Sequence, residues 1–267
     1  LWSSHFAIRP AKLFDGVEQR LTILIGCHGP SDGNWYTSKY HQWFSEERSE
    51  LFSKIILVSM PPRLSEESPW PKIGSVTEAR ILEKLRIFEG SPTHLLLTDS
   101  SKWVMYFHRT PGYWIRMLDF LPFFESPAGD RSVHHIRELY ATSEAARAEI
   151  AGLGSSSLYF WWFFAIGNCR NLTKGDLLGF PAPRLDAGGA VEIVRIFNEL
   201  MKSYKDNSSV KSRAKARYQE FDWVAAKPSV DAMDEFFAKV FGLTDEELDF
   251  VINYDIKVRV GDVAEGI

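Results

Sequence analysis

The segment that most constrains the fold is an unbroken hydrophobic run from Leu158 to Ile166, LYFWWFFAI. It is about half as long as the ~20 apolar residues that a helix needs to cross a bilayer. Apolar and polar residues do not alternate in it, as they would in a half-buried strand, so the run predicts a helix. A helix that is hydrophobic on every side must be surrounded by other elements, and the chain therefore needs a substantial core.

The composition agrees with a folded protein that can build such a core. The chain has 267 residues, of which 45% are hydrophobic and 25% charged, and this length suits one or two domains. Its two cysteines, Cys27 and Cys169, are too few for a disulfide framework, which predicts a cytoplasmic protein. The formal net charge of −4 does not favour nucleic-acid binding, although only the local charge at a contact decides it.

Secondary-structure signals predict mixed α and β parts followed by a helical end. Capping-box spacings begin helices at Ser75, Thr173 and Thr244, each followed three residues later by an acidic residue. The proline-rich segment 61–71 predicts a long loop or a domain boundary. The predicted elements are helices over 76–88, 143–153, 155–166, 190–204 and 231–241, strands over 93–98, 102–109 and 133–141, and a hairpin formed by 20–26 and 35–44.

Catalytic signatures are sparse in this sequence. Cys27-His28 and His134-His135 are adjacent pairs, whereas metal-binding residues on a helix are spaced by three or four positions. The sequence contains no nucleophile elbow and no phosphate-binding glycine loop. We therefore predict no catalytic residue and no metal site. A restriction-nuclease site built from a weak carboxylate–lysine pattern stays open as an alternative.

Three segments carry a family resemblance. The most distinctive is GLTDEELDF at 242–250 followed by INYDIK at 252–257, and the second comprises HFAIRP, KLFDGV and LTILI between residues 5 and 25. The third comprises SSSLYFWW, LTKGD and FPAP between residues 155 and 183. Together they resemble the C-terminal part of large adenine-specific DNA methylases of type II restriction–modification systems, in particular type IIG-like enzymes that join modification and often cleavage in one chain.

The resemblance implies an α+β fold in three parts. Residues 1–72 correspond to a remnant of the methyltransferase sheet and a linker, and 73–187 to a mixed-sheet DNA target-recognition domain. Residues 188–267 correspond to a mainly helical C-terminal region. The resemblance further implies that the chain is part of a longer polypeptide, whose upstream methyltransferase domain uses S-adenosylmethionine to methylate adenine N6 in double-stranded DNA.

The chain itself is expected to be non-catalytic and to hold no cofactor. Adenine-N6 methylases use a loop of the type Asn/Asp/Ser-Pro-Pro-aromatic to hold the flipped base. The nearest string here is Met60-Pro61-Pro62-Arg63, which lacks both the polar residue and the ring. The expected function is sequence-specific DNA recognition that positions the target for domains outside this chain, with no membrane partner. Whether the parent enzyme also cleaves DNA stays open.

Basic and aromatic residues are the candidate DNA contacts. Arginine forms paired hydrogen bonds with guanine, rings stack or wedge between bases, and lysine binds phosphates. The candidates are Arg109, Tyr113, Trp114, Arg116, Arg170, Asn171, Lys174, Lys211, Arg213, Lys215 and Arg217. The structural alternatives are core packing for the rings, ion pairs with acids such as Asp119 for the arginines, turn formation for 170–174, and a solvated helix face for the basic run 202–217.

Two other function classes stay open. A protein-interaction module of a restriction or defence complex would use the aromatic surface and the helical end. It would bind no DNA, or would bind it without salt dependence. A nuclease domain with an unrecognised metal site would instead cleave DNA only when a divalent metal is present.

Overall fold

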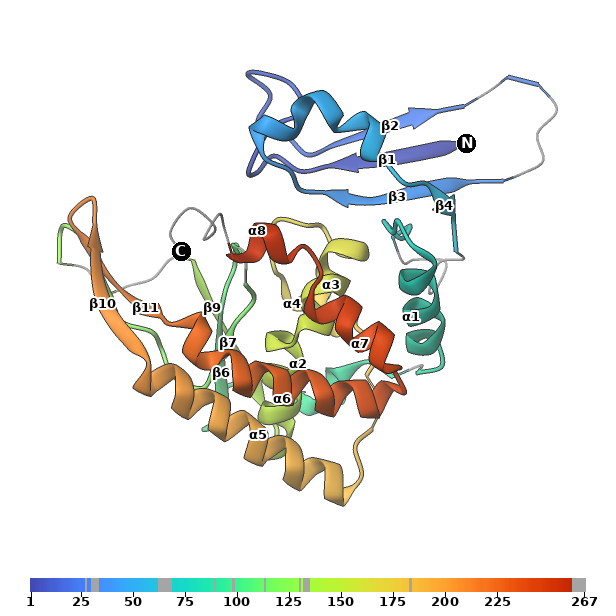
Figure 1. The fold of residues 1–267 in the computed structure, drawn as a ribbon. Coiled ribbons are helices and arrows are strands. Elements are labelled where there is room, and N and C mark those ends of the chain that lie inside the picture. Colours follow the sequence, from blue (N-terminus) through green and yellow to red (C-terminus); the bar gives the residue numbers. More distant parts are fainter. Residues whose placement is uncertain are drawn as a thin grey trace.

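The computed structural model describes most of the chain. Figure 1 shows a small sheet at the N-terminal end beside a larger, mainly helical body. Helices and sheets occur together in the described part, so the predicted α+β class is confirmed. The described residues are 1–26, 28–29, 34–61, 69–88, 90–97, 99–112, 114–129, 131, 135–182 and 184–260.

The N-terminal sheet is mixed, with its strands in the order β2-β1-β3-β4. These strands are β1 (Trp2–Phe6), β2 (Leu21–Ile25), β3 (Tyr36–His41) and β4 (Val58–Ser59). The predicted hairpin of 20–26 with 35–44 is wrong, because β1 lies between β2, to which it is antiparallel, and β3, to which it is parallel. This arrangement buries Phe6 of β1 in a small core with Trp43 and Leu51. Two 3-10 helices lie between β3 and β4 in the chain, η1 (Ser45–Glu50) and η2 (Phe52–Lys54).

The sheet in the middle of the body is antiparallel, with the order β5-β9-β6-β7. The mixed sheet that we expected within 73–187 therefore lies in the N-terminal part instead. The loop that joins the neighbouring strands β6 and β7 is too short for the crossover helix that parallel neighbours require. The strands are β5 (Leu96–Leu97), β6 (Val104–His108), β7 (Met117–Leu118) and β9 (Ile136–Ala141), preceded by α1 (Val76–Arg86) and η3 (Pro92–Leu95).

The predicted buried helix is confirmed as α3 (Ser157–Ala165), in which every residue is buried. The preceding helix, α2 (Glu144–Ser155), packs beside it and against β7. A Cβ at Gly154 would overlap with the side chain of Met117, so glycine at this position favours the close approach of α2 to β7. Among the described residues, no helix combines the length and the apolar character that crossing a bilayer requires.

The region after residue 188 is mainly helical, as predicted, but it also includes a β-hairpin that the sequence did not predict. Strands β10 (Ser208–Arg213) and β11 (Ala216–Phe221) form this hairpin, and β11 also pairs with β8 (Phe124–Glu125). Its two turn residues, Ala214 and Lys215, have φ of 48° and 65°. Such turns are usually marked by Asn or Gly, and neither is present here, so the sequence carries no hairpin signal. In the chain, α4 (Lys174–Leu178) and α5 (Ala187–Asp206) precede the hairpin, and α6 (Trp223–Phe241), α7 (Asp245–Ile252) and α8 (Ile256–Val260) follow it.

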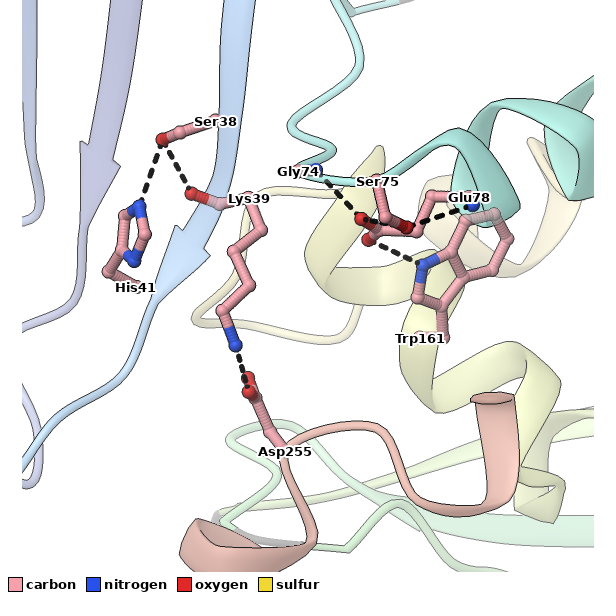
Figure 2. A network of polar contacts seen from close by, with 8 residues as sticks. All are labelled: Ser38, Lys39, His41, Gly74, Ser75, Glu78, Trp161 and Asp255. Carbon is pink, nitrogen blue, oxygen red and sulfur yellow. Dashed lines mark hydrogen bonds and ion pairs between the residues drawn. The ribbon is translucent and has the colours of Figure 1, made fainter. Parts of the chain in front are cut away.

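The predicted helix caps are confirmed, and one of them reaches into the core. The hydroxyls of Ser75, Thr173 and Thr244 each accept a hydrogen bond from the backbone N–H three residues later. Figure 2 shows that the carboxylate of Glu78 accepts from the N–H of Gly74 at 2.7 Å and from the indole of Trp161 at 3.0 Å. Glu78 therefore links the start of α1 to the central helix α3.

Polar and aromatic contacts tie the N-terminal sheet to the body. The ammonium of Lys39 lies 2.6 Å from a carboxylate oxygen of Asp255 (Figure 2). The ring of Tyr40 stacks on Phe164 with their centroids 5.7 Å apart. Of the predicted proline-rich boundary, residues 62–68 lie outside the described residues, and they include two residues of the Met60–Arg63 string.

Candidate nucleic-acid interface

The first predicted group lies on the loop that follows β6. Arg109 is exposed, and its guanidinium has no ion-pair partner among the described residues. Trp114 is held from two sides, because its indole N–H donates to the carbonyl of Arg259 at 3.1 Å and its ring stacks on Trp223. The guanidinium of Arg259 also lies 4.0 Å from the centroid of that ring. Trp114 therefore has a packing role, and Tyr113 lies outside the described residues.

Arg116 does not form the ion pair that was the alternative to a DNA contact. It is half-buried, with its guanidinium 5.5 Å from the ring centroid of Phe221. Asp119 instead lies 2.9 Å from Lys205 and 3.9 Å from Arg147. Both arginines of the first group therefore carry charges that no carboxylate of the described residues neutralises.

The second predicted group lies on the turn between α3 and α4. The side-chain oxygen of Asn168 accepts from the N–H groups of Arg170 and Asn171 at 3.0 and 2.8 Å, which shapes the turn. Cys169 occupies the left-handed region, with φ of 60°. Arg170 and Lys174 are exposed and unpaired within the described part of the chain. The side chain of Asn168 thus shapes the turn, and the charged groups of Arg170 and Lys174 remain available to bind a ligand.

Backbone hydrogen bonds bring the first two groups side by side. The N–H of Leu172 donates to the carbonyl of Arg109 at 2.6 Å. The hydroxyl of Thr110 donates to the side-chain oxygen of Asn171 at 3.2 Å. Residues about 60 positions apart in the sequence therefore form one local surface.

The third predicted group lies on the β10–β11 hairpin, so its interpretation as a solvated helix face is wrong. Lys211 is opposite Tyr218 in the strand register, and Arg213 is opposite Ala216. Because residues two positions apart on a strand share a face, Lys211 and Arg213 point to the same side of the hairpin. Arg217 points to the other side, where it binds Glu125 at 2.8 Å, and Lys215 lies in the turn.

The loop that carries the first group continues into the strand that holds this hairpin. β8 pairs with β11 through Phe124 and Tyr218, and the N–H of Gln219 donates to the carbonyl of Phe123 at 2.9 Å. Arg116 adds its contact with Phe221 at the base of the hairpin. The segment 109–125 therefore connects all three predicted groups.

The connected groups are rich in cations that lack acidic partners. Six of the predicted residues have no carboxylate within ion-pair distance among the described residues: Arg109, Arg116, Arg170, Lys174, Arg213 and Lys215. Lys211 and Arg217 are the exceptions, with Glu220 at 3.9 Å and Glu125 at 2.8 Å. Unpaired guanidinium and ammonium groups can bind phosphates, and guanidinium groups can also pair with guanine.

Two histidines beside Arg109, His108 and His135, form a pair that the sequence did not predict. The rings of His108 and His135 stack with centroids 6.1 Å apart, and the N–H of Arg109 donates to the carbonyl of His135 at 2.7 Å. Desolvation lowers the pKa of His108, and the neighbouring His135 and Arg116 lower it further. Their proximity follows from the pairing of β6 with β9, for which no local signal exists, and His134 lies outside the described residues.

The chemistry available at this surface is hydrogen bonding and charge pairing. Within the described ranges, no three His, Cys, Asp or Glu side chains are grouped closely enough to hold a metal ion. Comparisons with protein-family models, curated proteins and solved structures find no match to this chain. The arrangement of the cations is therefore the basis for a functional proposal.

Proposed function

We propose that this chain recognises double-stranded DNA, as the target-recognition part of a restriction–modification adenine-N6 methylase. The observation that carries the proposal is that three groups chosen from the sequence are connected through residues 109–125. Six of their cations have no carboxylate partner among the described residues. The resemblance of three segments to type II methylases supports the same conclusion. S-adenosylmethionine binding and methyl transfer are assigned to an upstream domain of the same polypeptide.

In this proposal the groups have different tasks. Arg109, beside the turn that carries Arg170 and Lys174, reads base edges, because an exposed arginine can donate two hydrogen bonds to one guanine. Arg213 and Lys215, near the tip of the hairpin, bind backbone phosphates and hold the duplex in register. Trp114 acts through packing, since both of its neighbours, Arg259 and Trp223, hold its ring against the body.

Duplex binding over a salt series tests the proposal. We expect weak binding whose log K falls linearly with log salt, with a slope of about −0.9 for each phosphate contacted and about −5 if all six cations take part. Fluorescence anisotropy with a labelled random-sequence duplex measures this slope. Absence of binding in low salt, or binding that does not respond to salt, would refute DNA recognition. Incorporation of labelled methyl groups by this chain alone would refute the assignment of catalysis to another domain.

A protein-contact role has one observation of its own. β2 is an edge strand of the N-terminal sheet, and its Leu24 and Ile25 are 60% and 59% exposed. An exposed apolar edge is a template for pairing with another chain. The upstream methyltransferase domain is the proposed partner at this edge. If it is, Leu24→Ser should weaken association of the two separately produced parts and leave DNA affinity unchanged, whereas unchanged association would contradict it.

A further inference from the structure

A pocket between the N-terminal sheet and the body lies outside the predicted DNA-contact groups. Its volume is about 250 Å³. β1, β2 and β3 form one wall, and the other comes from Lys72 and the turn 167–169 that follows α3. The lining residues that matter for its chemistry are His5, Arg20, Thr22, Tyr40, Lys72 and Cys169.

Lys72 supplies a largely enclosed positive charge in this pocket. Its ammonium donates one hydrogen bond, to the carbonyl of Gly167 at 3.0 Å. An ammonium has three N–H donors, so two of them lack an acceptor within the described residues. Burial lowers the pKa of Lys72 and outweighs the opposing effects of Cys169 and Asp176, and the nearby charge of Arg20 also lowers it. A buried cation with unused donors is unfavourable until an anion joins it.

Among the residues that the structure describes, no carboxylate lines the pocket to compensate these charges. Arg20 is exposed, and it has no ion pair in the described part of the chain. The nearby acid, Asp176, is engaged elsewhere, because its carboxylate accepts from the N–H and hydroxyl of Thr173 at 2.8 and 2.6 Å. The pocket therefore has an excess of positive charge.

The remaining walls are neutral. Burial lowers the pKa of His5 to about 4, with smaller effects from Lys72 and His41, so its imidazole is uncharged near pH 7. The ring nitrogens of His5 lie 3.0 Å from the hydroxyl of Thr22 and 3.3 Å from that of Thr37. Burial raises the pKa of Cys169, which keeps the thiol protonated. The described lining of the pocket thus combines two cations and a hydroxyl, and it includes no carboxylate.

We propose that this pocket binds a phosphate group through Lys72 and Arg20, with Thr22 as a neutral partner. A phosphate oxygen accepts charge-assisted hydrogen bonds from both cations and matches the charge of the pocket. The group belongs either to a free phosphate or phosphate ester or to the backbone of a bound nucleic acid, and the chemistry at the pocket is the same. This site is separate from the base-reading surface, so it does not depend on the proposed DNA function.

Thermal unfolding of the chain with phosphate and with pyrophosphate, at constant ionic strength set with chloride, tests the proposal. We expect a saturable rise in Tm, because a ligand that binds only the folded state stabilises it. Lys72→Met should weaken this effect at least about tenfold, because a hydrogen bond to a charged group is lost. The variant should fold, since the substitution removes a buried charge. The control Lys202→Met, on the exposed face of α5, should keep the effect.

Duplex binding by the same variants distinguishes the two sources of the phosphate. If the group belongs to DNA, Lys72→Met lowers duplex affinity and flattens the salt slope by about 0.9. If it belongs to a free ligand, duplex binding is unchanged and only the response to phosphate is lost. The proposal is overturned if neither anion gives a saturable shift and Lys72→Met leaves duplex binding intact, or if both lysine variants respond to phosphate as the unmodified chain does. A chain that binds no DNA still yields the phosphate result.

Discussion

The hairpin cations form two matched pairs, each with one lysine and one arginine, that test the proposed phosphate contacts. Arg213 and Lys215, near the tip, have no carboxylate partner among the described residues. Lys211 and Arg217 lie 3.9 Å and 2.8 Å from carboxylate oxygens. Replacing the tip pair with alanine removes charges that are free to meet phosphates. Replacing the other pair removes charges that are already partly neutralised.

The magnitude follows from the number of free charges. Each phosphate contact contributes about 0.9 to the salt slope, so Arg213→Ala with Lys215→Ala should flatten the slope by about 1.8. Between about 50 and 200 mM salt, the unmodified chain should then lose about 12-fold more affinity than this variant. Lys211→Ala with Arg217→Ala should flatten the slope less, because cations that are already paired with Glu220 and Glu125 contribute less to phosphate contacts.

Anisotropy titrations of one labelled duplex over a salt series measure both variants against the unmodified chain. Circular dichroism verifies that each variant keeps its helix content. If both double variants flatten the salt slope equally, the ion pairs of Lys211 and Arg217 do not affect DNA binding. No flattening by the tip pair would remove the hairpin from the DNA contact and refute its assigned role.

Three further predictions concern base reading and stability. Arg109→Ala should change the base preference of selected duplexes, at about 1–3 kcal/mol per lost contact, and a loss that is uniform over all sequences would identify a phosphate contact instead. Glu78→Ala should lower the unfolding free energy by roughly 2–6 kcal/mol in urea, because the N–H groups of Gly74 and Trp161 lose their buried acceptor, and a loss below about 1 kcal/mol would contradict this. Burial raises the pKa of Asp234 from 3.8 to about 7, so the folded chain holds a proton that the unfolded chain has released. The free energy of unfolding should therefore fall as pH rises from about 3.8 to about 7, and Asp234→Asn should flatten this pH dependence. An unchanged pH profile in this variant would argue against Asp234 as the group that holds the proton.

Local signals predicted the helices well. The run Leu158–Ile166 became the fully buried α3, and the hydroxyls of Ser75, Thr173 and Thr244 cap helices as expected. These features depend on a few neighbouring residues, because burial on all sides and an N-cap hydrogen bond are decided within one or two turns. They were therefore readable without tertiary information.

Strand pairing was predicted poorly, because its cause is not local. The insertion of β1 between β2 and β3 depends on burying Phe6 against a distant Trp43. The β10–β11 hairpin uses Ala214 and Lys215 in a turn that sequence rules assign to Asn and Gly. The basic run was consequently interpreted as part of a helix, although its residues were correctly identified as exposed cations.

The sequence was enough to select the residues of the candidate site, but it did not predict how they are arranged in space. Arg109 and Asn171 were chosen separately, and their closeness comes from the contacts of Leu172 and Thr110 across the fold. The structural alternative to a DNA contact at Arg116 was an ion pair with an acid such as Asp119. It does not form, because Asp119 is occupied by cations from α2 and α5.

One short turn links the phosphate pocket to the base-reading group. The carbonyl of Gly167 accepts from Lys72 in the pocket, and the N–H of Leu172 donates to Arg109 at the interface. Between them, the side chain of Asn168 holds the N–H of Arg170. An anion that binds the two remaining donors of Lys72 would therefore lie beside the same turn that positions Arg170. Linkage requires any resulting change in DNA affinity to be matched by an equal change in anion affinity when DNA binds, so either titration measures the coupling.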